Sequence, residues 1–147
     1  MAYSGPFFPT QPKKYRGDVN KIFYRSLWER NVMTKLDTWA QILEWSSEEL
    51  VIPYRSPVDN KIHRYFPDFQ VRMQTPTGIR NAILEVKPKS QCKEPKKPKR
   101  VTKRFISEVK EFATNQAKWG AATAYCADRG WDFMVLTEDD IFGKTTK

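Results

Sequence analysis

The sequence lacks most of what a zinc protein, a secreted protein or a membrane protein needs. It has one histidine, His63, and only two cysteines, Cys92 and Cys126, which stand at no metal-ligand spacing. A zinc site is therefore not expected, and we expect two reduced thiols rather than a disulfide. No apolar run approaches the roughly 20 residues that span a bilayer, and the amino terminus lacks the apolar core of a signal peptide. We therefore expect a soluble, intracellular protein with no membrane partner.

Positive charge is what the sequence has in excess. It holds 26 Lys and Arg against 17 Asp and Glu, which gives a net charge of +9. Most of this charge lies in residues 87–104, where nine basic residues stand with a single acid, Glu94. Because Pro88, Pro95 and Pro98 interrupt this segment, we expect an exposed basic loop. An anionic partner is indicated, either nucleic acid or an acidic protein surface.

The basic loop is a natural contact for DNA phosphates, and such contacts make binding depend steeply on salt. The alternatives are a generic basic loop or a contact to an acidic protein. The predicted DNA-binding residues of this segment are Lys89, Lys93, Lys96, Lys97, Lys99, Arg100, Lys103 and Arg104.

The chain length predicts a single domain, and the hydrophobic pattern predicts α/β structure. Residues 1–17 contain three prolines and read as an extended N-terminal arm on the domain surface, or alternatively as a docking arm for a partner. The domain proper would then be 18–147. Helices are predicted over 20–38 and 102–128, and strands over 39–45, 50–55, 62–73, 81–87 and 131–137, the last of them buried. Because a helix precedes the last strand, we expect at least one parallel strand pair with helices covering the sheet.

The strongest candidate site combines Asp68 with Glu85 and Lys87, seventeen positions further on. Side chains alternate along a strand, so Glu85 and Lys87 share one face while Val86 points into the core. If Asp68 lies on the adjacent strand, two carboxylates and an ammonium converge. Carboxylate oxygens suit Mg²⁺, and acids within apolar strands are costly unless they are paired or bind a metal. The alternative is a strand end with a solvated salt bridge.

Three further residues are weaker candidates. Glu29 lies on a helix that is otherwise built for burial and could supply a third carboxylate, or could be an exposed acid paired with a neighbouring arginine. Gln116 falls within the helical stripe of 102–128 and could contact the site lysine or a phosphate, or be a buried amide bonded to the backbone. Lys118 lies off that stripe and reads as solvated. We interpret His63 as a hairpin residue rather than a general base.

These residues resemble the PD-(D/E)xK nuclease superfamily, with Glu29 on the first helix, Pro67-Asp68 on one strand and Glu85-Val86-Lys87 on the next. The order of segments resembles the endonuclease subunit of TnsA-type transposases and, more closely, the head completion nucleases of T-even-like tailed bacteriophages. The stretches that carry this closer resemblance are 52–57, 64–69, 85–88 and 115–119.

The resemblance implies a restriction-endonuclease-like mixed β-sheet flanked by helices, and a Mg²⁺-dependent endodeoxyribonuclease in which Mn²⁺ can substitute. Asp68, Glu85 and the Val86 carbonyl would bind the metal, Lys87 would activate the water, and Glu29 would assist. The basic loop, with Gln116 and Lys118, would grip the DNA backbone. Since phosphate contacts carry no sequence information, little sequence specificity is expected.

The implied role is phage head completion after DNA packaging, in the host cytoplasm and at the virion head or neck. The expected partners are DNA and portal, neck or other head completion proteins. Two alternatives remain open at this stage. One is a structural head-closure protein that keeps a nuclease fold without turnover, and the other is a DNA repair or junction-resolving nuclease.

Overall fold

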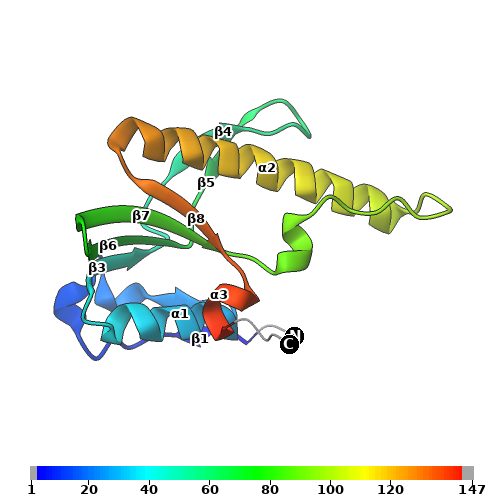
Figure 1. Cartoon of the computed structure of the whole chain (residues 1–147). Coiled ribbons are helices and arrows are strands. Elements are labelled where there is room, and N and C mark those ends of the chain that lie inside the picture. The colour runs from blue at the N-terminus through cyan, green and yellow to red at the C-terminus, as the bar shows by residue number, and fades with distance from the viewer. Residues whose placement is uncertain (1–2, 144–147) are drawn as a thin grey trace.

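The computed structural model describes residues 3–143, so the outermost residues of the predicted arm and domain, 1–2 and 144–147, lie outside the described part. At its centre is a four-stranded sheet in the order β3-β6-β7-β8 (Figure 1). The strands of this sheet are β3 (Ile42–Ser47), β6 (Phe69–Thr75), β7 (Gly78–Val86) and β8 (Asp132–Leu136). Only β7 and β8 run parallel, so the sheet is mixed and the expected parallel pair is confirmed.

Two helices cover opposite faces of this sheet, α1 (Leu27–Thr38) and α2 (Lys103–Arg129) (Figure 1). Each helix has a capped amino terminus, because the Ser26 side chain accepts from the Glu29 N–H and the Thr102 side chain accepts from the Phe105 N–H. Gly130 ends α2 in the left-handed conformation, at φ 69°. The result is the three-layer α/β architecture that the sequence predicted.

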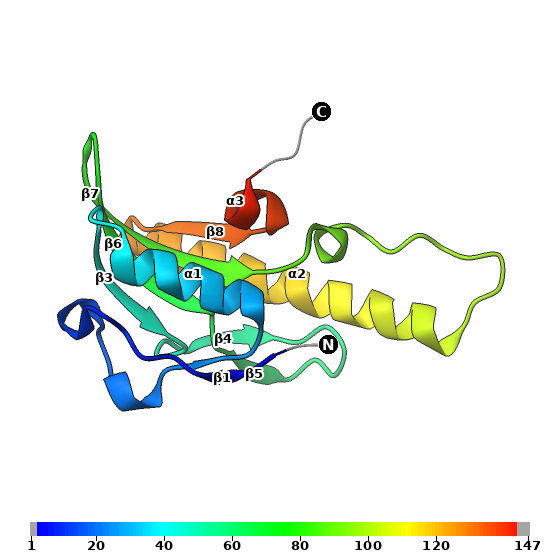
Figure 2. The same ribbon diagram turned by 90° about the horizontal axis from the view of Figure 1, so that it is seen from below.

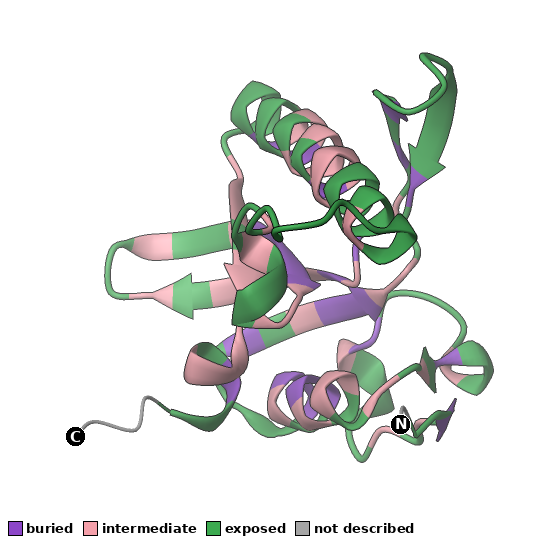
Figure 3. Ribbon diagram, turned by 90° about the vertical axis from the view of Figure 1, so that its right-hand side faces the viewer, coloured by how far each residue is buried: buried purple, intermediate pink, exposed green. Residues whose placement is uncertain are grey.

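The core is divided into two clusters by the sheet. One cluster joins α1 to β3, β6 and β7 around Trp45, Phe69 and Met33. The other joins α2 to β7 and to the hairpin of β4 (Ile52–Arg55) and β5 (Ile62–Tyr65). Figure 3 shows buried residues along the central strands and on the side of α1 that faces them, whereas the outer side of α2 is exposed.

The predicted strand 62–73 is wrong as a single element. The structure divides it into β5, which pairs with β4, and β6, which belongs to the central sheet. Pro67 lies at the break, and proline has no N–H to donate to a strand ladder. Asp68 therefore lies in the short connection just before β6.

Two other elements differ from their predictions. The helix predicted over 20–38 begins only at Leu27, because the preceding residues form a 3-10 turn (Val19–Lys21) and the short strand β2 (Phe23–Tyr24), which pairs with β1 (Gly5–Pro6). The last strand is not buried, since β8 is an edge strand of the sheet and Met134 keeps 40% of its surface exposed.

The amino-terminal segment packs across α1 and β3. Tyr15 is buried with its ring centroid 4.7 Å from that of Trp45. The buried carboxylate of Asp37 accepts hydrogen bonds from the Thr10 N–H and hydroxyl and from the Gln11 N–H. These contacts tie the segment to the domain through both apolar packing and buried polar bonds.

The basic segment 87–104 is largely an exposed loop, with a 3-10 turn at Lys89–Cys92 and with its last two residues in the first turn of α2. Figures 1 and 2 show that the amino-terminal part of α2 and this loop project past the end of the sheet. A short helix, α3 (Glu138–Phe142), follows β8. None of the helices in the described residues combines the length and the apolar character needed to cross a membrane.

Candidate active site at one end of the sheet

Asp68 and Glu85 meet because β6 and β7 are antiparallel neighbours. Phe69 pairs with Leu84, which brings the residue before β6 beside the residue after Leu84. Oδ2 of Asp68 accepts a hydrogen bond of 2.7 Å from the Val86 N–H, and Oε1 of Glu85 accepts one of 2.7 Å from the Tyr65 hydroxyl. Both carboxylates are thus oriented by fixed donors, and Glu85 is only 6% exposed.

Two more carboxylates reach the same end of the sheet. Glu29, in the first turn of α1, and Glu48, which follows β3, each place a carboxylate oxygen with one from Asp68 so that all three lie within 4.8 Å of one another. The structure therefore brings Glu29, Asp68 and Glu85 together as the sequence predicted, and adds Glu48.

Sequence reasoning missed Glu48 because its position depends on strand pairing. Ser47 is paired with Phe69, so the next residue along falls beside Asp68, and the Glu48 N–H donates to the Asp68 carbonyl at 3.1 Å. Its backbone is left-handed, with φ 54°, which turns the chain at the strand end. The signal available in the sequence was an acid directly after an apolar strand, which is common on surfaces.

Cations surround the acids. A cleft of about 400 Å³ is lined by the four carboxylates and by the side chains of Arg25, Arg64, Lys87 and Lys118. Arg25 forms a two-pronged ion pair with Glu48, with both N–O distances 2.9 Å, and its backbone N–H donates to Glu29. Lys87 follows β7 directly, and its N–H bonds to the Leu136 carbonyl of the parallel strand.

Burial dominates the electrostatics of the carboxylates. It raises the pKa of Asp68 well above the ordinary range, and the nearby charges of Glu85 and Glu29 raise that pKa further. Burial also raises the pKa of Glu85, although the Tyr65 hydrogen bond opposes this shift, and it raises the pKa of Glu29. Such acids favour either a proton or a bound cation. A divalent ion that prefers oxygen ligands fits this donor set.

The prediction that Gln116 is the amide within the apolar stripe of α2 is wrong by one residue. Gln116 is exposed, whereas Asn115 is 4% exposed and takes the inward position, in line with buried Ala122 and Cys126. Since each residue turns a helix by about 100°, a shift of one position changes which side chain faces the core.

Lys118 is not simply solvated, as the stripe had indicated. Its Nζ lies 5.7 Å from the ring centroid of Tyr65 and 5.9 Å from that of Tyr54, and its charge acts on Glu85. His63 lies on β5 and contacts Asp59 at 2.7 Å, so it is a hairpin residue outside the cleft lining.

Apart from Lys87, the basic loop does not line the acidic cleft. Lys89 forms a 2.7 Å ion pair with Asp139, and Arg104 pairs with Glu108 at 3.4 Å. Lys93 and Arg104 line a separate hollow beside α2 that also includes Asn115. The remaining basic side chains are exposed, namely Lys96, Lys97, Lys99, Arg100 and Lys103.

A mixed sheet flanked by helices, with acids and a lysine gathered at one end, is the arrangement of a restriction-endonuclease-like protein. Residues 40–138 match the model of the TnsA-like endonuclease N-terminal family, and the chain belongs to that family. It is also similar to the head completion nuclease of Enterobacteria phage T4, being 41% identical over 145 residues that cover 96% of this chain and 95% of the T4 protein. The predicted superfamily and fold class are thereby confirmed. Residues 40–138 include Glu48, Asp68, Glu85 and Lys87, whereas Glu29 precedes them.

Proposed function

We propose that this protein is a divalent-metal-dependent endodeoxyribonuclease that cleaves phosphodiester bonds during phage head completion, after the DNA has been packaged. The observation that carries the proposal is the convergence of Asp68, Glu85 and Lys87 in one cleft of a TnsA-like endonuclease fold. Similarity to a head completion nuclease supports the role in assembly. The protein would act in the host cytoplasm and at the head or neck of the particle, beside portal, neck or other head completion proteins.

The residues that would hold Mg²⁺ are Asp68 and Glu85 with the backbone carbonyl of Val86, and Mn²⁺ would substitute. A divalent ion at such a site supplies Lewis acidity toward the phosphate and toward a water ligand. The Val86 N–H and the Tyr65 hydroxyl fix the two carboxylates by hydrogen bonds, so little reorganisation is needed when a cation binds.

Lys87 is the residue that we assign to the attacking water and to the charge that develops on the phosphate. Lys87 lines the same cleft as the carboxylates and its positive charge acts on Asp68 and Glu85, and a preorganised cation next to developing negative charge lowers the barrier. Glu29 would order the water from the α1 side. Burial raises the pKa of Glu29, although the hydrogen bond from the Arg25 N–H opposes this shift, and the raised pKa favours proton uptake.

DNA would be held by its backbone. The exposed cations of the 87–104 loop project past the sheet, and Lys118 lies inside the cleft, so a strand could contact both. Gln116 is exposed on α2, the helix that carries Lys118, and would contact a phosphate from the solvent side. Phosphate contacts predict little sequence specificity and a steep dependence of affinity on salt.

Cleavage of linear and circular duplex DNA tests this function, with Mg²⁺, Mn²⁺ or EDTA present. We expect wild type to cut both forms only with metal, and Lys87→Ala to lose about 10²–10³-fold in rate, as for loss of one charge-stabilising donor. Lys110→Ala, an exposed lysine on α2 outside the cleft, is the matched control and should cut normally. Equal cutting by Lys87→Ala and wild type would remove Lys87 from the mechanism, and DNA binding without cutting by either would favour a structural head-closure role.

A further inference from the structure

Phe66 is an aromatic side chain that is exposed at the acidic cleft and does not pack in the core. It lines the cleft that holds the four carboxylates, and 44% of its surface is exposed. Neither core cluster includes it. The other exposed aromatic side chains of the described residues, such as Phe8 and Trp39, do not line this cleft. An exposed aromatic ring in a polar, charged cleft therefore indicates a ligand that has both an apolar face and charged groups.

The backbone holds Phe66 in this outward position. Its neighbours Tyr65 and Pro67 are both buried, and Tyr65 is bonded to Glu85, so the alternation of the extended chain turns Phe66 out toward the cleft. Pro67 also restricts the backbone of the residue before it to extended conformations. The ring is thus presented at little further cost in conformational entropy.

Arg64 completes the surface. Its guanidinium carbon lies 5.8 Å from the centroid of the Phe66 ring, and its side chain lines the same cleft. An aromatic ring beside a planar guanidinium is the combination on which nucleic-acid bases stack, with the cation close to the neighbouring phosphate.

We propose that Phe66 and Arg64 form a stacking platform for an unpaired base next to the scissile phosphate. In a fully paired duplex both faces of each base are covered by its neighbours, so only an unstacked base can use the platform. The preferred substrate is then DNA with an unpaired strand at the cut, such as an overhang or a frayed end. A protein partner is disfavoured as the occupant because the cleft also contains the acids and Lys87. This inference rests on the proposed nuclease function.

The test compares cleavage of a blunt duplex with cleavage of the same sequence carrying a single-stranded overhang. We expect wild type to cut the overhang substrate about tenfold faster or more, a range set by the strength of base–aromatic stacking. Phe66→Ala and Phe66→Leu should both reduce this ratio to about one, because leucine keeps an apolar side chain but has no π face. Phe66→Trp should retain it. Phe8→Ala, in the amino-terminal segment, is the control for loss of an exposed ring and should behave as wild type.

A binding measurement separates failure of the platform from failure of the nuclease. Single-stranded oligonucleotides carrying 2-aminopurine are titrated with each protein in EDTA, so that no turnover is needed. The platform is supported if wild type quenches the 2-aminopurine fluorescence and Phe66→Ala and Phe66→Leu do not, even if no substrate is cut. Equal quenching by wild type and Phe66→Leu, or an unchanged overhang preference in that variant, overturns it. Circular dichroism checks that each variant is folded.

Discussion

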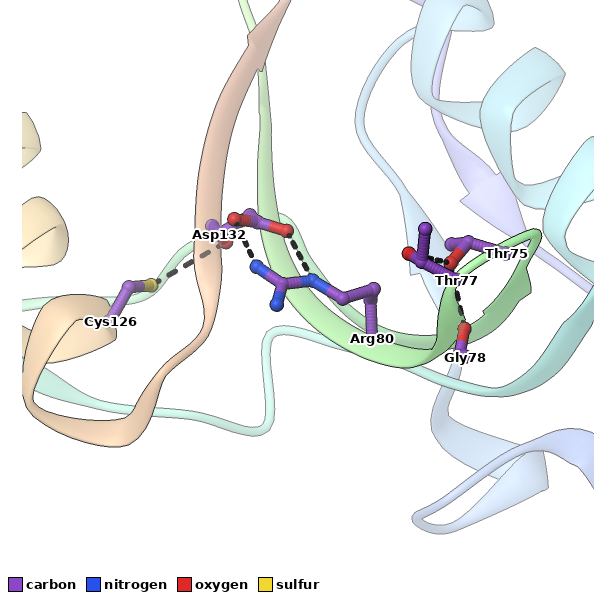
Figure 4. A network of polar contacts seen from close by, with 6 residues as sticks. All are labelled: Thr75, Thr77, Gly78, Arg80, Cys126 and Asp132. Carbon is purple, nitrogen blue, oxygen red and sulfur yellow. Dashed lines mark hydrogen bonds and ion pairs between the residues drawn. The ribbon is translucent and has the colours of Figure 1, made fainter.

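At one end of the central sheet, around Asp68, three carboxylates place oxygens within 4.8 Å of one another; at the other end, Arg80 faces Asp132, a partner of opposite charge. Figure 4 shows this second end, where the guanidinium of Arg80 on β7 reaches Asp132 on β8 at 2.7 and 3.2 Å. Beside it the β6–β7 turn is closed by the Thr75 hydroxyl, which donates to the Gly78 carbonyl at 2.7 Å. The two ends belong to the same strands.

The difference indicates that the end around Asp68 is less stable than it could be because it gathers the carboxylates that the proposed reaction needs. Gathering half-buried carboxylates costs free energy, which the Arg25–Glu48 ion pair offsets only in part, because the pKa of Asp68 remains raised. At the paired end Arg80 and Asp132 carry opposite charges, so this cost does not arise between them. If this contrast is correct, removing the Asp68 charge should lower cleavage and raise stability, whereas removing a charge at the paired end should leave cleavage unchanged and alter stability little.

Asp68→Asn is expected to give the largest effect. Cleavage should fall more than about 10³-fold, since a ligand for the metal is lost. The metal-free variant should nevertheless melt about 2–8 °C above wild type, because a neutral amide removes a buried like charge and can still accept from the Val86 N–H. Nuclease assays and thermal melts in EDTA measure both quantities, and DNA binding should be largely retained.

The dependence of this stabilisation on pH is its internal control. Because the pKa of Asp68 is raised in the folded protein, the folded state keeps a proton that the unfolded chain releases above about pH 4. The stability of metal-free wild type should therefore fall as the pH rises from that value through the raised pKa. The advantage of Asp68→Asn should grow over the same interval and vanish at lower pH. If the difference in melting temperature between Asp68→Asn and wild type stayed constant from pH 4 to 8, the stabilisation could not come from loss of the Asp68 charge.

Glu48→Gln tests whether the acidic end extends to the carboxylate that the sequence did not reveal. We expect cleavage to fall about 10- to 100-fold, as for other groups that orient a metal site, because Glu48 also holds Arg25 through two hydrogen bonds. Glu49→Gln is the matched control, since Glu49 is the next residue, is exposed and lies outside the group. Wild-type rates for Glu48→Gln would restrict the acidic end to Glu29, Asp68 and Glu85.

The elements that could be predicted are those that local patterns determine. The two long helices and the parallel pair follow from periodicity and from the strand–helix–strand order, and Glu85 and Lys87 share a face by simple alternation. Pro67 also offered a local signal for a strand break that the apolar residues around it obscured.

The elements that could not be predicted depend on packing between distant segments. Glu48 approaches Asp68 only through the register of β3 on β6, which no pattern within either strand specifies. The choice between Asn115 and Gln116 as the inward amide rests on a rotation of about 100° of α2, and a stripe at spacings of three and four residues does not resolve it. The same rotation directs Lys118 to Tyr65 and the cleft.

The smallest effect is expected at the paired end of the sheet. Arg80→Ala removes a two-pronged ion pair, but both side chains are nearly half exposed, so solvent screens the interaction and side-chain entropy offsets part of it. We expect the melting temperature to change by less than about 2 °C and cleavage to match wild type, with the difference in melting shrinking further at high salt. Asp132→Ala should behave alike, since the pair is lost from either side. A large loss of cleavage in Arg80→Ala would mean that the strands couple the two ends of the sheet. The ion pair at Arg80 and the carboxylates around Asp68 would then belong to one connected site.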